Sequence, residues 1–128
     1  MGFTGVDHIV VRVRDIDEGI ATYRDGLGLE LDHTDEHEAL GIKQAFFNLS
    51  DGSFIELVAP TSPESAVGRA LEGRGEGIHT IALAVDNLDE TVERLKAGGA
   101  RLLGEGGPQV FIHPKSAHGV LVQLSPKK

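Results

Sequence analysis

The stretch Asp7-His8-Ile9-Val10-Val11-Arg12-Val13-Arg14-Asp15 decides the fold, because its pattern returns as His79-Thr80-Ile81-Ala82-Leu83-Ala84-Val85-Asp86-Asn87. The offset between His8 and Thr80 is 72 residues, from 80 − 8. Each run alternates β-branched or small apolar residues and ends at an Asx residue that suits a helix N-cap. Each run therefore predicts a strand that leads into a helix, and the chain repeats this unit once.

The two predicted helices share a pattern of apolar residues spaced three or four apart, which gives one buried face. Glycines end both patterns, at 26 and 28 in the first half and at 98 and 99 in the second. Alternating runs at 42–49 and 54–58, matched by 110–113 and 120–124, predict the closing strands. Short strands near 29–33 and 101–104 complete each unit.

These elements predict an α+β fold of two tandem βαβββ modules, at about residues 5–60 and 77–126, within a single domain of residues 1–128. Ser62-Pro63-Glu64 predicts the start of a connecting helix over about 62–73, because Ser suits the N-cap and Pro the first helical position.

Composition narrows the range of partners. A net charge of −8 argues against nucleic acid or an anionic membrane, and no run approaches a membrane span. The chain has no Cys, which fits a reducing compartment, so we expect a cytoplasmic protein that binds a small molecule.

Strand alternation sorts the side chains into two faces. Val11 and Val13 face the first helix, and Ile55 and Leu57 do the same from a later strand. The opposite face also holds Val10 and Val58, and it collects polar and aromatic side chains: His8, Arg12, Gln44, Phe46, Asn48, Phe54 and Glu56, with Thr80, Phe111, His113 and Gln123 from the second half. We interpret this mixture as a pocket, the alternative being a solvated sheet face.

Several stretches carry a family resemblance: Asp7-His8-Ile9, Tyr23 to Leu29, Ile55-Glu56-Leu57, Gly75 to His79, and His113 to Ser116 leading to Gly119 to Val122. Together they resemble the vicinal oxygen chelate superfamily, and within it the methylmalonyl-CoA epimerases. The resemblance implies paired modules that form a U-shaped mixed or antiparallel sheet around a cavity, with the helices outside. It also implies a divalent metal that chelates two substrate oxygens, and a homodimer.

The resemblance also assigns site residues, with departures. The family's metal ligands fall on His8, Glu56, Thr80 (a His in the family) and Gln123 (a Glu in the family). Its other catalytic carboxylate falls on Gln44. An amide side chain has no acid–base chemistry near neutral pH, so we expect the two-carboxylate epimerase reaction to be weak or absent.

Two alternatives stay open for the metal. His8, Glu56 and Gln123 would form a three-ligand site for Co, Mn, Ni, Mg or Zn. Otherwise His8 and Glu56 would hydrogen-bond each other in a metal-free cavity.

The predicted catalytic residues are Glu56, Gln44 and Gln123. The predicted substrate contacts are Arg12, Phe46, Asn48, Thr80, Phe111, His113 and Lys115. Arg12 would pair with Glu56 or bind a substrate carboxylate, and the His113–Ser116 segment would otherwise only stabilise a turn. We expect the polar run from His33 to Glu38 to be a solvated segment between strands.

Two functions follow from these residues. The first is a divergent epimerase-like isomerase or lyase that stabilises the enolate of a small acyl or keto acid compound. The alternative is a metal-free sequestering protein of the same superfamily, which loses the ligands and keeps the cavity. A dioxygenase ranks last, because the repeat positions supply only one His.

Overall fold

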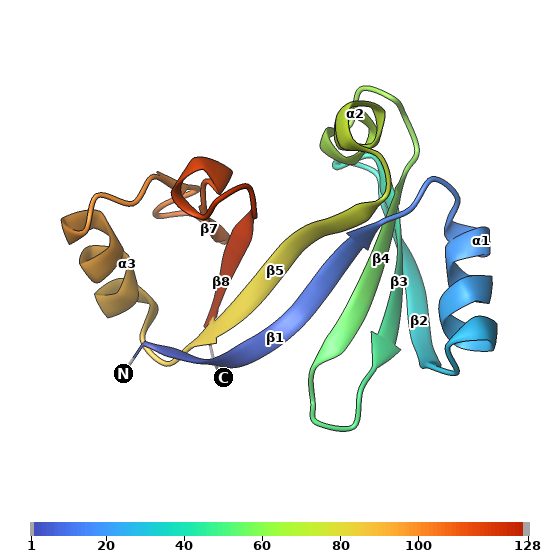
Figure 1. The fold of residues 1–128 in the computed structure, drawn as a ribbon, viewed down its shortest axis with the longest axis horizontal. Coiled ribbons are helices and arrows are strands. Elements are labelled where there is room, and N and C mark those ends of the chain that lie inside the picture. The colour runs from blue at the N-terminus through green and yellow to red at the C-terminus, as the bar shows by residue number, and fades with distance from the viewer. Residues whose placement is uncertain (1, 127–128) are drawn as a thin grey trace. The chain divides into compact units, whose positions relative to one another are not determined.

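The computed structural model describes residues 2–126, and Figure 1 shows the order of its elements. The strands are β1 (Phe3–Arg12), β2 (Glu30–His37), β3 (Ile42–Asn48), β4 (Phe54–Pro60), β5 (Gly77–Val85), β6 (Leu102–Leu103), β7 (Val110–Ile112) and β8 (Val122–Pro126). The helices are α1 (Ile16–Ile20), which continues as a π-helical segment (Ala21–Gly26), α2 (Ala66–Arg74), α3 (Leu88–Ala97) and a 3₁₀ turn (Pro114–Ser116). The predicted α+β class is confirmed.

Hydrogen-bonded strands follow the order β2-β3-β4-β1-β5-β8-β7-β6. β5 and β8 are parallel, whereas β2–β3, β3–β4, β6–β7 and β7–β8 are antiparallel, so the sheet is mixed as predicted. The chain forms two compact units: residues 9–79 make one, and residues up to His8 together with those from Thr80 onward make the other.

Within residues 9–79, α1 covers one face of the strands. Phe47 and Leu57 are fully buried there beside Val13, and Ile16 and Ile20 of α1 pack against them. Asp15 caps the helix, because its carboxylate accepts a hydrogen bond from the Glu18 amide. The alternation rule therefore identified the helix-covered face of β1, β3 and β4 correctly.

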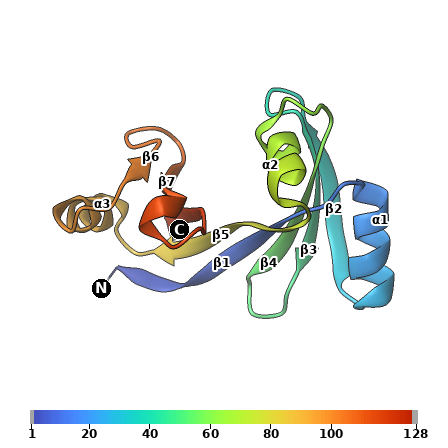
Figure 2. The same cartoon turned by 45° about the horizontal axis from the view of Figure 1, so that its top comes forward.

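The opposite face of the same strands is partly covered by α2, which lies across the strands from α1 in Figures 1 and 2. Val67 and Leu71 of α2 pack on Val10, Ile42 and Val58, all of them buried. Val10 and Val58 thus face away from α1, as strand alternation predicts, and they are buried under α2. The connecting helix needs an apolar surface to bury its own stripe, and these two valines supply it.

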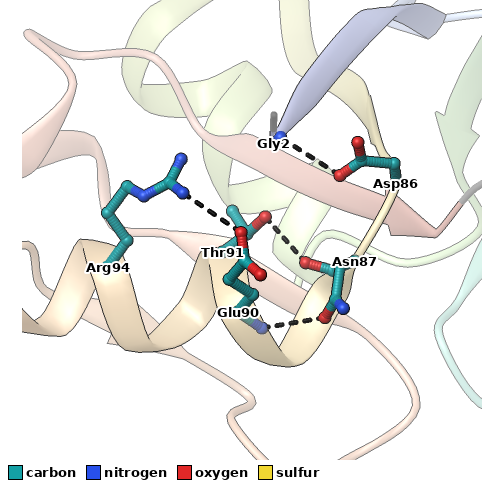
Figure 3. A network of polar contacts seen from close by, with 6 residues as sticks. All are labelled: Gly2, Asp86, Asn87, Glu90, Thr91 and Arg94. Atoms are coloured by element: carbon teal, nitrogen blue, oxygen red, sulfur yellow. Dashed lines mark hydrogen bonds and ion pairs between the residues drawn. The ribbon is translucent and has the colours of Figure 1, made fainter.

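In the other unit, α3 packs on β5, β7 and β8 around Val85, Val92, Val110 and Leu124. Figure 3 shows how the helix begins: the Glu90 amide donates to Asn87 Oδ1, and Thr91 Oγ1 donates to the Asn87 carbonyl. Val85 lies 72 residues after Val13, and each valine is buried beneath the helix that follows its strand. This agrees with the repeat read from the sequence.

Two elements differ from their predicted bounds. α2 begins at Ala66, not near Ser62, because Ser65 Oγ accepts the capping hydrogen bond from the Gly68 amide. The run from His33 to His37 belongs to β2 and is not a segment between strands; it pairs residue by residue with β3. Across residues 2–126, the helices are all too short or too polar for a membrane span.

Candidate functional site

Gln44 and Glu56 form the central polar contact of the unit made of residues 9–79. They lie on adjacent strands, where Gln44 is paired with Val58 and Phe46 with Glu56. Gln44 Nε2 donates a hydrogen bond to Glu56 Oε2 at 2.9 Å, and both side chains are half-buried. The amide therefore holds the carboxylate in place on the sheet face away from α1, where alternation had placed both residues.

Aromatic side chains lie on the same two strands, with Phe46 paired to Glu56. The ring of Phe46 lies 6.1 Å from that of Phe54, measured between centroids, and His33 stacks on Phe46 at 4.4 Å with an interplanar angle of 14°. Asn48, on the same strand, is exposed and donates from Nδ2 to Asp32 Oδ1 at 2.9 Å. The structure thus brings Phe46 and Asn48 to the predicted face and ties them to β2.

His8 belongs to the other unit and is buried. Its Nδ1 lies 2.8 Å from Asp7 Oδ2. When Nδ1 donates this hydrogen bond, the neutral imidazole carries its lone pair on Nε2, the nitrogen through which His8 would bind the predicted metal. The neighbouring Asp7, which the sequence had not singled out, fixes the ring orientation.

Thr80 and Gln123 lie on β5 and β8 of that same unit. Thr80 is 3% exposed, and Gln123 is half-buried, with Ala82 beside it on β5 and Phe111 opposite it on β7. The structure gives these residues and Phe111 sheet positions suited to the predicted roles, which themselves stay predictions.

His113 and Lys115 form a turn. His113 Nδ1 accepts a hydrogen bond from the Lys115 backbone amide at 3.0 Å, and Ser116 Oγ accepts one from the Arg101 amide. Partial burial, and then the charges of Arg101 and Lys115, lower the pKa of His113, so the neutral ring that this cap requires is favoured. These contacts support the turn-stabilising interpretation of the segment.

Arg12 makes a contact that sequence reasoning missed. The side chain is 4% exposed, and Nη1 donates to His79 Nδ1 at 3.1 Å. Burial, reinforced by the positive charges of Arg12 and Arg74, lowers the pKa of His79 to about 4. The expected ion pair between Arg12 and Glu56 is absent from the contacts of Arg12 within residues 2–126.

The donor set implied for a metal is one imidazole (His8), one carboxylate (Glu56) and one amide oxygen (Gln123). Within residues 2–126 no three His, Cys, Asp or Glu side chains cluster. The predicted set holds only two ligands of these types, so the metal site stays a prediction, and the chemistry proposed for the chain uses its own side chains.

Comparison with known proteins identifies the family. Residues 6–124 match the glyoxalase-like domain family. The chain is 33% identical to the ethylmalonyl-CoA/methylmalonyl-CoA epimerase of Cereibacter sphaeroides, covering 93% of this chain and 95% of that protein. It is 31% identical to the human mitochondrial methylmalonyl-CoA epimerase, covering 93% of this chain and 72% of that protein.

Solved structures agree. The methylmalonyl-CoA epimerase of Mycobacterium tuberculosis superposes with a TM-score of 0.86 at 36% identity, over 98% of this chain and 89% of that one. A variant of the Streptomyces coelicolor epimerase, in complex with 2-nitronate-propionyl-CoA, gives a TM-score of 0.83 at 35% identity, over 98% of both chains. The chain therefore belongs to the glyoxalase-like family of the vicinal oxygen chelate superfamily, in its methylmalonyl-CoA epimerase-like branch.

Proposed function

We propose that the chain is an epimerase-like enzyme that forms and stabilises the enolate of a small acyl-CoA or keto acid compound, with weakened epimerisation. The observation that carries the proposal is the pairing of Gln44 with Glu56. It leaves one group of the pair able to exchange a proton near neutral pH and one that only donates or accepts hydrogen bonds.

Epimerisation needs a base on one side of the α-carbon and an acid on the other. In the proposed reaction Glu56 takes the α-proton and returns it, and the amide of Gln44 orients the carboxylate and the developing oxyanion. A proton returned from the side on which it left restores the original configuration. Exchange of the α-proton with solvent would then be faster than inversion of the α-carbon. An epimerase with two carboxylates would not show this difference.

The test measures deuterium uptake at the α-carbon of methylmalonyl-CoA beside the rate of epimerisation, with the Cereibacter sphaeroides enzyme as reference. We expect slow uptake that exceeds the buffer rate, is lost in Glu56→Gln, and is faster than inversion. Epimerisation at the reference rate would refute the weakened chemistry. Binding of the thioester with no exchange above buffer would refute the enzyme and favour the sequestering protein.

The same preparation tests two further predictions. Metal analysis with and without a chelator tests the divalent ion predicted at His8, Glu56 and Gln123. Light scattering coupled to size exclusion tests the homodimer predicted from the resemblance.

A further inference from the structure

Arg12 is a buried cation whose contacts are all to neutral acceptors. Nε donates to the Gly75 carbonyl, and Nη1 donates to the Ile78 carbonyl and to His79 Nδ1, each at 3.1 Å. Since Nδ1 accepts this hydrogen bond, the imidazole of His79 is neutral in the arrangement seen. Buried arginines are normally paired with an acid, and within residues 2–126 Arg12 has no such partner.

The Nη2 donors of Arg12 are not used by the contacts described above. A guanidinium has five N–H groups, and three are used, so the two on Nη2 have no acceptor among residues 2–126. No side-chain nitrogen or oxygen in that range is both sealed from solvent and without a partner, so Nη2 has solvent access. A Cβ built on Gly77 would lie 4.0 Å from Nη2, which places this atom beside Gly77.

Gly77 and Arg12 both line a pocket of about 370 Å³ beside α1. Thr22, Tyr23, Val11 and Val13 line it as well. The lining therefore combines polar and apolar residues beside the position of Arg12 Nη2, which suits a small ligand with a charged end and an apolar body.

The surrounding charges define the ligand further. Arg74 acts electrostatically on Arg12, and Arg14 holds Glu76, whose Oε2 accepts from the Arg14 amide at 2.9 Å. Glu76 and Glu18 line the pocket as well. The arginines attract an anion, whereas the two carboxylates disfavour a second negative charge on it.

We propose that this pocket binds the carboxylate of a small organic acid, with Arg12 Nη2 as its charged donor. The ligand is a monoanion, because the acidic lining opposes a phosphate dianion. The site lies wholly within residues 9–79 and does not depend on the proposed enolate chemistry. Its carboxylate comes from a free acid or from the acyl group of a thioester.

The first test titrates the ¹⁵N-labelled parent protein with propionate. NMR follows the signals of the arginine side chains and of the backbone amides. We expect saturable shifts at Arg12 and at Gly75 to Gly77, half-complete on the order of 1 mM, with none at the exposed Arg24. Propionamide, a neutral isostere, should have no effect, and phosphate should bind at least tenfold more weakly. The absence of shifts at Arg12, or equal binding of phosphate, would overturn the proposal.

Two further arms complete the test. In Arg12→Lys the planar fork is lost, so we expect half-saturation to need at least tenfold more propionate, whereas the matched control Arg24→Lys should bind as the parent does. Equal binding by both variants would overturn the proposal, and the titration of the parent decides it if Arg12→Lys fails to fold. If the Arg12 signals shift with methylmalonyl-CoA but not with coenzyme A, the bound carboxylate belongs to an acyl group. If they shift with propionate alone, the bound carboxylate is that of a free acid. Both outcomes support the site.

Discussion

Replacing Gln44 by Glu tests the central contact of the candidate site. In the parent, Gln44 Nε2 donates to Glu56 Oε2 at 2.9 Å, and the variant puts a carboxylate where the amide was. Two ionised carboxylates that relax to about 4 Å repel each other by about 1 kcal/mol in water and about 4 kcal/mol at an effective dielectric constant of 20. Both side chains are half-buried, so we expect about 2 kcal/mol.

The destabilisation of the Gln44→Glu variant depends on pH, because the two carboxyl groups can share a proton at low pH. Repulsion disfavours the doubly ionised pair, so in the folded variant it raises one carboxyl pKa above its unfolded value. Stability relative to the parent is therefore best preserved below about pH 4, where the pair keeps its proton. It is lost as pH rises through the raised pKa, and the full difference appears by about pH 7.

Urea unfolding at pH 4 and pH 7.5 measures this difference, with Gln109→Glu as a control that adds the same charge at an exposed position. A destabilisation that is equal at the two pH values, or no larger than that of the control, would refute the reasoning. The variant also regains a second acid–base group, so we expect methylmalonyl-CoA epimerisation to rise about tenfold or more. Stability that shifts as expected without this gain would show that Gln44 is not the missing catalytic position.

Three other substitutions test the packing and the electrostatics. Folding lowers the pKa of His79 from 6.5 to about 4, so the parent loses roughly 2–3 kcal/mol of stability as pH falls through that window. The variant His79→Gln keeps an acceptor for Arg12 but has no group that titrates there. Its urea midpoint should therefore fall less between pH 7 and pH 4.5 than that of the parent. Phe47→Ala empties a fully buried site and should cost about 3–5 kcal/mol by urea unfolding, a value that a loss under 1 kcal/mol would contradict. Gly68→Ala would place a Cβ 2.6 Å from the Ser62 carbonyl oxygen, so the usual helix gain should reverse to a loss of about 1–3 kcal/mol in thermal or urea unfolding.

Local signals predicted most of the fold. The N-caps at Asp15 and Asn87 each accept from the amide three residues on, so a short window of sequence is enough to place them. Strand alternation likewise assigned Val13 and Leu57 to the α1 core and Gln44 and Glu56 to the other face. These predictions succeed because the deciding contacts lie within a few residues or follow from the period of a strand.

Errors arose where tertiary contacts outweigh local preference. Ser62-Pro63 has good capping chemistry, yet α2 starts at Ala66 with Ser65 as its N-cap, because Gly68 lets the first turn close against the carbonyls of the preceding segment. The run from His33 to His37 is too polar to predict as a strand. It forms one at the sheet edge, where charged side chains can reach solvent while the backbone pairs with β3.

The contact between Arg12 and His79 could not be predicted from the sequence pattern. Alternation assigned Arg12 to a sheet face but gave no partner for it; its long side chain reaches the carbonyls of Gly75 and Ile78, and its Nη1 also donates to the His79 ring. Two of its three acceptors are main-chain carbonyls, which every residue possesses and which leave no trace in a sequence. An arginine in an alternating strand therefore looks like any inward-facing charge, and only the folded path of residues 75–79 makes it a buried, preorganised donor. Strand alternation thus predicted Arg12 as a substrate contact, whereas the acceptors that hold its guanidinium in place can be seen only in the structure.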